Sequence, residues 1–155
     1  MRLLLSSLAF IAVVPAGGAG QASCDLKGVW QLVSGKYGGE AGPANYRQIK
    51  IITGGHFAFV GETDRGVKEM KSTADSLAAF RTMGSGGGTY TLRGTTYTEK
   101  LEYFSDPAYL GMSVAFSCRT EGDQFFQTGT FPVMEGGKKV REVTLEEVWR
   151  RIEKL

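Results

Sequence analysis

Short runs of β-branched and aromatic residues are separated by glycine-rich turns along most of the chain. Within these runs apolar and polar positions tend to alternate, as they do in half-buried strands. The pattern predicts about eight strands, at 26–34, 47–53, 56–61, 89–93, 95–105, 111–119, 123–130 and 140–151. Because short turns such as Thr53-Gly54-Gly55 join most neighbours, we expect an antiparallel meander.

One segment between these strands has a different period. Met70, Leu77 and Met83 recur at roughly helical spacing, which predicts a short helix over 73–82. Residues 85–88, Ser-Gly-Gly-Gly, are expected to end the helix and act as a hinge. The pattern as a whole predicts an all-β protein, an antiparallel up-and-down barrel of about eight strands with one short helix near its mouth. There the helix would either cover a ligand or plug the barrel.

The C-terminal segment 143–155 fits two interpretations. Leu145, Val148 and Ile152 form a helical stripe, whereas Leu145, Glu147 and Trp149 would share one face of a strand. We expect a strand to about residue 151, because a barrel needs a last strand that closes against the first.

The first 22 residues have the layout of a secretory signal peptide. Arg2 precedes an apolar run over 3–14, and Gly20-Gln21-Ala22 offers small residues for cleavage. The apolar run is shorter than the roughly 20 residues that span a bilayer. We therefore expect a signal peptide over 1–22, a single barrel domain over 23–155, and a secreted or periplasmic protein. The alternative is a lipid anchor on Cys24, but Gln21 fits a lipoprotein signal poorly.

Charge and cysteine content narrow the partners and the compartment. The chain has 18 basic and 16 acidic residues with no basic run, so we expect neither nucleic-acid binding nor stable membrane insertion. After export, Cys24 and Cys118 are expected to form a disulfide. The alternative is a buried free thiol at Cys118 and a frayed end at Cys24. The sequence does not indicate an oligomeric state.

Three short motifs carry a family resemblance. The segment 28–34, Gly-Val-Trp-Gln-Leu-Val-Ser, resembles the opening strand of the calycin superfamily of lipocalins and fatty-acid-binding proteins. The segments 88–92 and 147–151 resemble a family of small bacterial lipocalin-like proteins of unknown function. The resemblance implies a barrel whose closed end is formed by Gly28 and Trp30, with Arg150 or Arg151 packed over the indole ring. It implies a fold more than a ligand.

Several predicted strands place polar groups on the face that also carries large aromatic rings. A buried carboxylate needs a partner or water, so these positions indicate a polar cavity rather than a dry core. The residues expected to line it are Tyr97, Glu99, Tyr103, Gln127, Glu147 and Trp149, with His56 and Arg47 as further candidates. The alternative is the opposite facing, with Thr98, Lys100, Glu102 and Phe104 inside.

Three functions are compatible with such a barrel. The first is an exported protein that binds a small amphipathic molecule. The second is an isomerase-type or cyclase-type enzyme in which Glu99 acts with Tyr97 or Tyr103. The third is an inhibitor or interaction module that uses its loops at 35–45 and 105–111, with Tyr109 at the contact. His56 is the single histidine, so neither a zinc site nor a cofactor is expected.

Overall fold

The structure is a computed structural model that describes residues 24–64 and 69–155. The predicted signal peptide at 1–22 lies outside the described residues. The chain forms the elements β1 (Gly28–Tyr37), β2 (Glu40–Ala41), β3 (Arg47–Ile52), β4 (His56–Glu62), α1 (Thr73–Arg81), β5 (Met83–Arg93), β6 (Thr96–Phe104), η1 (Pro107–Tyr109), β7 (Ser113–Glu121), β8 (Gln124–Glu135) and β9 (Lys138–Glu153).

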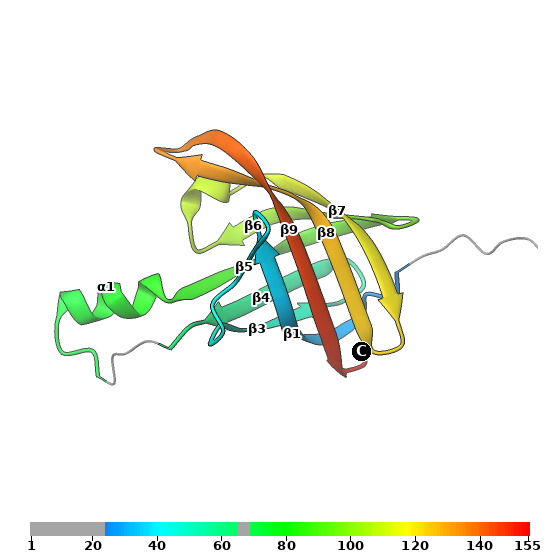
Figure 1. Cartoon of the computed structure of the whole chain (residues 1–155), viewed down its shortest axis with the longest axis horizontal. Coiled ribbons are helices and arrows are strands. Elements are labelled where there is room, and N and C mark those ends of the chain that lie inside the picture. Colours follow the sequence, from blue (N-terminus) through cyan, green and yellow to red (C-terminus); the bar gives the residue numbers. More distant parts are fainter. Residues whose placement is uncertain (1–23, 65–68) are drawn as a thin grey trace, which may run out of the picture.

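The strands form a closed antiparallel barrel of eight strands, which confirms the predicted fold class (Figure 1). Each strand from β3 to β8 pairs with the next, and β1 pairs with both β3 and β9. The short strand β2 pairs only with the end of β1 and takes no part in the closure. Closure removes the exposed edges that an open sheet of this length would present.

The last segment is a strand throughout, which resolves the ambiguity of its sequence. β9 pairs with β8 from Lys138 and with β1 from Leu145 to Glu153. Val143 and Trp149 face the interior, and the exposed residues between them face outward. Pairing on both sides outweighs the helical propensity of this segment, because tertiary contacts routinely override propensity.

The predicted helix is present, but it covers nothing. Ser72 caps its N-terminus by accepting a hydrogen bond from the backbone N–H of Asp75. The helix lies between β4 and β5 at the mouth of the barrel and projects away from it (Figure 1). Leu77 and Phe80 are more than half exposed, so the expectation that they cover a ligand or plug the barrel is wrong.

The predicted glycine hinge is wrong as well. Residues 85–88 belong to β5, which pairs with β4 and β6 along this stretch. The glycines are required by close packing: a Cβ at Gly86 would lie 2.7 Å from the ring of Phe59 and 2.8 Å from that of Phe104. Glycine here lets two rings from neighbouring strands meet across β5.

Two groups of aromatic side chains divide the interior. One surrounds Trp30 at the end where β1 begins, and we call this the closed end; it contains Trp30, Tyr97, Phe116, Phe125 and Trp149. The second is a row of ring contacts across the other end, the mouth, formed by Phe59, Phe104, Tyr109, Phe131 and Tyr37. The polar side chains of the interior lie between the two groups.

Candidate functional site

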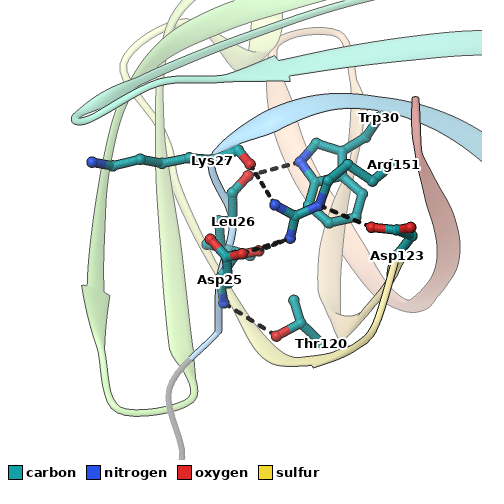
Figure 2. Close-up of polar contacts among 7 residues, drawn as sticks. All are labelled: Asp25, Leu26, Lys27, Trp30, Thr120, Asp123 and Arg151. Atoms are coloured by element: carbon teal, nitrogen blue, oxygen red, sulfur yellow. Dashed lines mark hydrogen bonds and ion pairs between the residues drawn. The ribbon is translucent and has the colours of Figure 1, made fainter. Parts of the chain in front are cut away.

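The closed end is held by a buried arginine. The Arg151 guanidinium lies over the Trp30 ring, 4.4 Å from its centroid. It donates hydrogen bonds to the backbone carbonyls of Lys27 (3.1 Å) and Asp25 (2.9 Å) and to the Asp25 carboxylate (2.8 Å) (Figure 2). The Trp30 indole N–H in turn donates to the carbonyl of Leu26 at 2.7 Å. Arg151 and Trp30 thus fix the chain segment that enters the barrel.

A disulfide completes this end. Cys24 and Cys118 are bonded across a sequence separation of 94 residues, which confirms the predicted pairing. Beside it, the backbone N–H of Asp25 donates to the Thr120 hydroxyl at 3.1 Å (Figure 2). In the loop-entropy model a bridge of this separation contributes at most about 4–5 kcal/mol. The bridge ties the entry of β1 to β7 on the far side of the barrel.

The barrel contains a cavity of about 200 Å³ between the two aromatic groups. A wider groove of about 570 Å³ lies at the mouth. Four residues line both spaces, namely Tyr37, Tyr46, Leu145 and Glu147. The inner cavity therefore adjoins the mouth groove, and Glu147 is among the residues at their boundary.

A buried polar network forms the inner side of this cavity. The Lys50 ammonium group pairs with Glu99 at 2.9 Å and donates to the Gln127 side-chain oxygen at 3.3 Å. The Gln127 amide nitrogen donates to Glu147 at 2.7 Å, and the indole N–H of Trp149 donates to the same carboxylate oxygen at 3.1 Å. The network joins β3, β6, β8 and β9, and its members Lys50, Glu99 and Gln127 are at most 5% exposed.

Register explains why these side chains meet. Gln127 and Glu147 are directly opposite each other in the pairing of β8 with β9. Lys50 is opposite Trp30 in β1 and Phe59 in β4, so it shares their inward face. Its ammonium group lies 4.9 Å from the Trp149 ring centroid, a cation–π contact that further stabilises the buried charge.

The environment raises the pKa of several groups of the interior, among them Glu147, Tyr97 and Tyr46. Burial raises the pKa of the Glu147 carboxyl; Lys50 opposes this shift, and Glu99 adds to it. Burial raises the pKa of the Tyr97 hydroxyl well above its ordinary value, with a further contribution from Glu99. Tyr97 therefore stays protonated, and its buried hydroxyl has no hydrogen-bond partner among the described residues.

Five of the predicted cavity residues face the interior together. Glu99, Gln127 and Glu147 line the cavity, and Tyr97 and Trp149 are fully buried on its closed-end side. The opposite facing of β6 is excluded for Thr98, Lys100 and Glu102, which are partly or fully exposed.

Tyr103 faces outward, contrary to the prediction. A register shift in the pairing of β5 with β6 places Gly88 opposite Leu101 and Gly87 opposite Tyr103, so Glu102 is an extra residue. Such a bulge reverses the facing of the residues after it. Tyr103 is 74% exposed as a result, and Phe104 packs inside in its place.

The two further candidates also lie outside the cavity. The Arg47 side chain is 77% exposed and pairs with Glu62 at 2.7 Å on the outer surface. His56 is exposed at the start of β4, on the face opposite to Phe57. Both predictions that these residues line the cavity are wrong, because β3 and β4 turn these positions outward.

Lys50 is the residue that the sequence interpretation missed. β3 places Gln48, Lys50 and Ile52 inside and the apolar Ile49 and Ile51 outside, which is the reverse of the usual pattern. The inward facing of Lys50 could have been predicted from the turn at 53–55. It pairs Ile52 with Phe57 and Lys50 with Phe59, so the aromatic face of β4 identifies the inner face of β3.

The geometry bears on the two alternative functions. The Tyr97 hydroxyl is near enough to Glu99 for that carboxylate to raise its pKa, but Tyr97 is not among the residues that line the cavity, and Tyr103 is outside. Tyr109 stacks on Phe131, with ring centroids 5.2 Å apart, and contacts Phe104. It belongs to the interior row of rings and is not free at the loop tip.

Comparison of this chain with protein-family models and with curated protein sequences gives no match. The architecture is that of a lipocalin-like barrel, and membership of the calycin superfamily stays a prediction. Within residues 24–64 and 69–155, no three His, Cys, Asp or Glu side chains come together as a metal site. In the same part of the chain, no helix is long and apolar enough to cross a membrane.

Proposed function

We propose that this protein is an exported binding protein that holds a small amphipathic molecule in its barrel. One observation carries the proposal: a hydrogen-bonded polar network lines a cavity that adjoins the mouth groove. Aromatic walls with a few fixed polar groups are the usual composition of a small-molecule site.

The cost of the network supports a role beyond stability. A buried ion pair such as Lys50–Glu99 loses much of its attraction to desolvation, and apolar replacements are often neutral or more stable. A barrel that only needed a core would be filled by apolar side chains. Polar groups that line an accessible cavity are instead available to orient a ligand.

Export is the second part of the proposal. The Cys24–Cys118 disulfide supports an oxidising compartment, where such bonds form and persist. The signal-like sequence at 1–22 supports the same location. The mature protein would then meet its ligand outside the cytoplasm.

Native mass spectrometry of the mature protein, purified without reduction from its exported location, tests the proposal. We expect the mass of a bound small molecule. Leu145→Trp should abolish it, because Leu145 lines both the cavity and the mouth groove. Thr144→Trp is the matched control, since Thr144 faces outward beside it and the variant should retain the ligand.

Thermal melts establish that both tryptophan variants are folded. A wild-type protein without any bound small molecule, or equal binding by both variants, would contradict the proposal. Glu99→Ala is a poorer choice of variant than the sequence indicates, because it leaves the buried Lys50 ammonium group without its partner.

A further inference from the structure

The charges in the cavity are unbalanced, and the chemistry of the ligand follows from this if the proposed binding function holds. The ionisable groups that line the cavity, apart from tyrosines, are Lys50, Glu99 and Glu147, which are one cation and two carboxyl groups. Lys50 pairs with Glu99. Glu147 has hydrogen bonds only from neutral donors, Gln127 and Trp149, among the described residues.

Lys50 already has a carboxylate partner and is the less available of the charged groups for a ligand. Its ammonium group donates to Glu99 and Gln127, and it also faces the ring of Trp149. An ammonium group has three N–H donors, and the two hydrogen bonds use two of them. The charge of Lys50 is already neutralised by Glu99, so an anionic ligand would have to compete with that carboxylate.

Glu147, in contrast, can accept a further hydrogen bond. Both of its hydrogen bonds go to the same oxygen, Oε2, and within residues 24–64 and 69–155 Oε1 accepts none. Glu147 is only partly buried and lies where the cavity joins the mouth groove. Its second oxygen is thus open to accept a hydrogen bond at the boundary between the cavity and the mouth groove.

The rest of the cavity is small and largely apolar, with Gln48, Tyr37 and Tyr46 as its further polar residues. Phe59, Phe104, Phe131 and Leu101 supply its walls. Its volume of about 200 Å³ is less than the ~300–1,000 Å³ typical of drug-sized ligands. A ligand that fits inside has one apolar group of about the size of an aromatic ring.

The cations that line the mouth groove do not offset the surplus carboxyl group of the cavity. Lys36 and Arg81 line the groove, but both are exposed or only partly buried. Water and salt screen exposed charges, whereas a carboxylate in the protein interior is screened much less.

We propose that the cavity binds a small amphipathic amine, whose ammonium group pairs with Glu147 and whose apolar part lies against the phenylalanine walls. The ammonium group supplies the charge that Glu147 lacks, and it can also lie close to aromatic faces. The environment of Glu147 also raises its pKa, which fits a carboxyl group that lacks a cationic partner of its own.

Titration calorimetry with three probes of similar shape tests this inference: phenethylamine, phenethyl alcohol and phenylacetate. We expect phenethylamine to bind at least about ten-fold more tightly than the alcohol, the effect of one charge-assisted hydrogen bond. Phenylacetate should bind most weakly. Glu147→Gln should remove the preference for the amine and leave the affinity for the alcohol unchanged.

Glu146→Gln is the control, because Glu146 lies next to Glu147 but faces outward. It should keep the preference for the amine. Equal affinity for amine and alcohol, or a natural bound molecule without a basic nitrogen, would overturn the amine inference and leave the binding function intact. A wild-type protein that binds no probe and carries no small molecule would overturn both.

Discussion

The closed end and the cavity each place a cation over a tryptophan ring, but the hydrogen-bond partners of the two cations differ. At the closed end, Arg151 lies over Trp30 and donates to backbone carbonyls and to the exposed carboxylate of Asp25. In the cavity, Lys50 lies over Trp149 and donates to buried side chains. The arginine holds the chain segment that enters the barrel and lies 3.9 Å from the Asp123 carboxylate, whereas the lysine belongs to a network that continues to Glu147.

The difference assigns separate roles to the two contacts: Arg151 on Trp30 closes the barrel, and Lys50 on Trp149 belongs to the proposed binding site. The carboxylates beside Arg151, those of Asp25 and Asp123, are largely exposed, so water solvates their charge. The carboxyl groups of the cavity lie inside the barrel, and the cavity has one more of them than it has cations. The same contact between a cation and an indole ring therefore serves stability at one end and, in the proposed function, ligand recognition at the other.

The largest expected effect comes from breaking the cavity pair. Lys50→Met leaves the Glu99 carboxylate buried without its partner, which should lower the free energy of unfolding by about 3–5 kcal/mol. Urea unfolding monitored by tryptophan fluorescence measures this loss. The double variant Lys50→Met, Glu99→Leu should recover most of it, because it removes both charges.

A loss below about 1 kcal/mol in the single variant would contradict this account, because it is the value typical of solvent-exposed pairs. It would mean that water screens Lys50 and Glu99 in solution. The comparison between the two ends would then fail, since the network would no longer be a buried one.

A smaller effect is expected at the closed end. Arg151→Lys keeps the charge but loses the planar group that reaches both Lys27 and Asp25, so stability should fall by about 1–3 kcal/mol. Hydrogen exchange of the Trp30 indole N–H should become faster, since Arg151 holds the segment whose carbonyl accepts it. Affinity for phenethylamine should not change.

Arg150→Lys is the matched control for this substitution. Arg150 is exposed and donates a hydrogen bond to Gln31 on the outer surface. Its replacement should change stability by no more than about 0.5 kcal/mol. If Arg151→Lys weakened amine binding at unchanged stability, the two ends would be coupled and the division of roles would be wrong.

The sequence was sufficient to predict the fold and most of the side chains that face the interior. Alternating patterns and glycine turns predict the order of the strands, and neighbouring aromatic residues correctly place Glu99, Gln127 and Glu147 inside. Local patterns failed where the facing depends on a partner strand. Tyr103 is turned outward by a bulge that its own strand does not reveal, and the polar residues of β3 face inward.

The charge balance of the cavity could not be predicted from local sequence patterns, for the same reason. Lys50 and Glu99 are 49 residues apart and meet only because the barrel closes. Their pairing fixes which carboxyl group is left without a cation. The helix shows the converse: its spacing predicts it correctly, but spacing alone could not indicate that its apolar side chains stay exposed.

The smallest effect concerns pH, and it tests the surplus carboxyl group directly. The pKa of Glu147 is raised in the folded protein above its ordinary value of 4.5. The folded state therefore holds this proton more tightly than the unfolded state does. The resulting stability is fully present below pH 4.5 and is lost as pH rises through the folded pKa.

Glu147→Gln cannot lose that proton, so the unliganded variant should gain stability relative to the wild type as pH rises above 4.5. Urea unfolding of both proteins across this range measures the difference, in which the other titrating groups cancel. Saturating phenethylamine should reverse the trend in the wild type, because an ammonium group beside Glu147 favours the ionised carboxylate. A difference that stays constant with pH would mean that Glu147 is solvated like a surface carboxylate, and the cavity would then have no charge preference for its ligand.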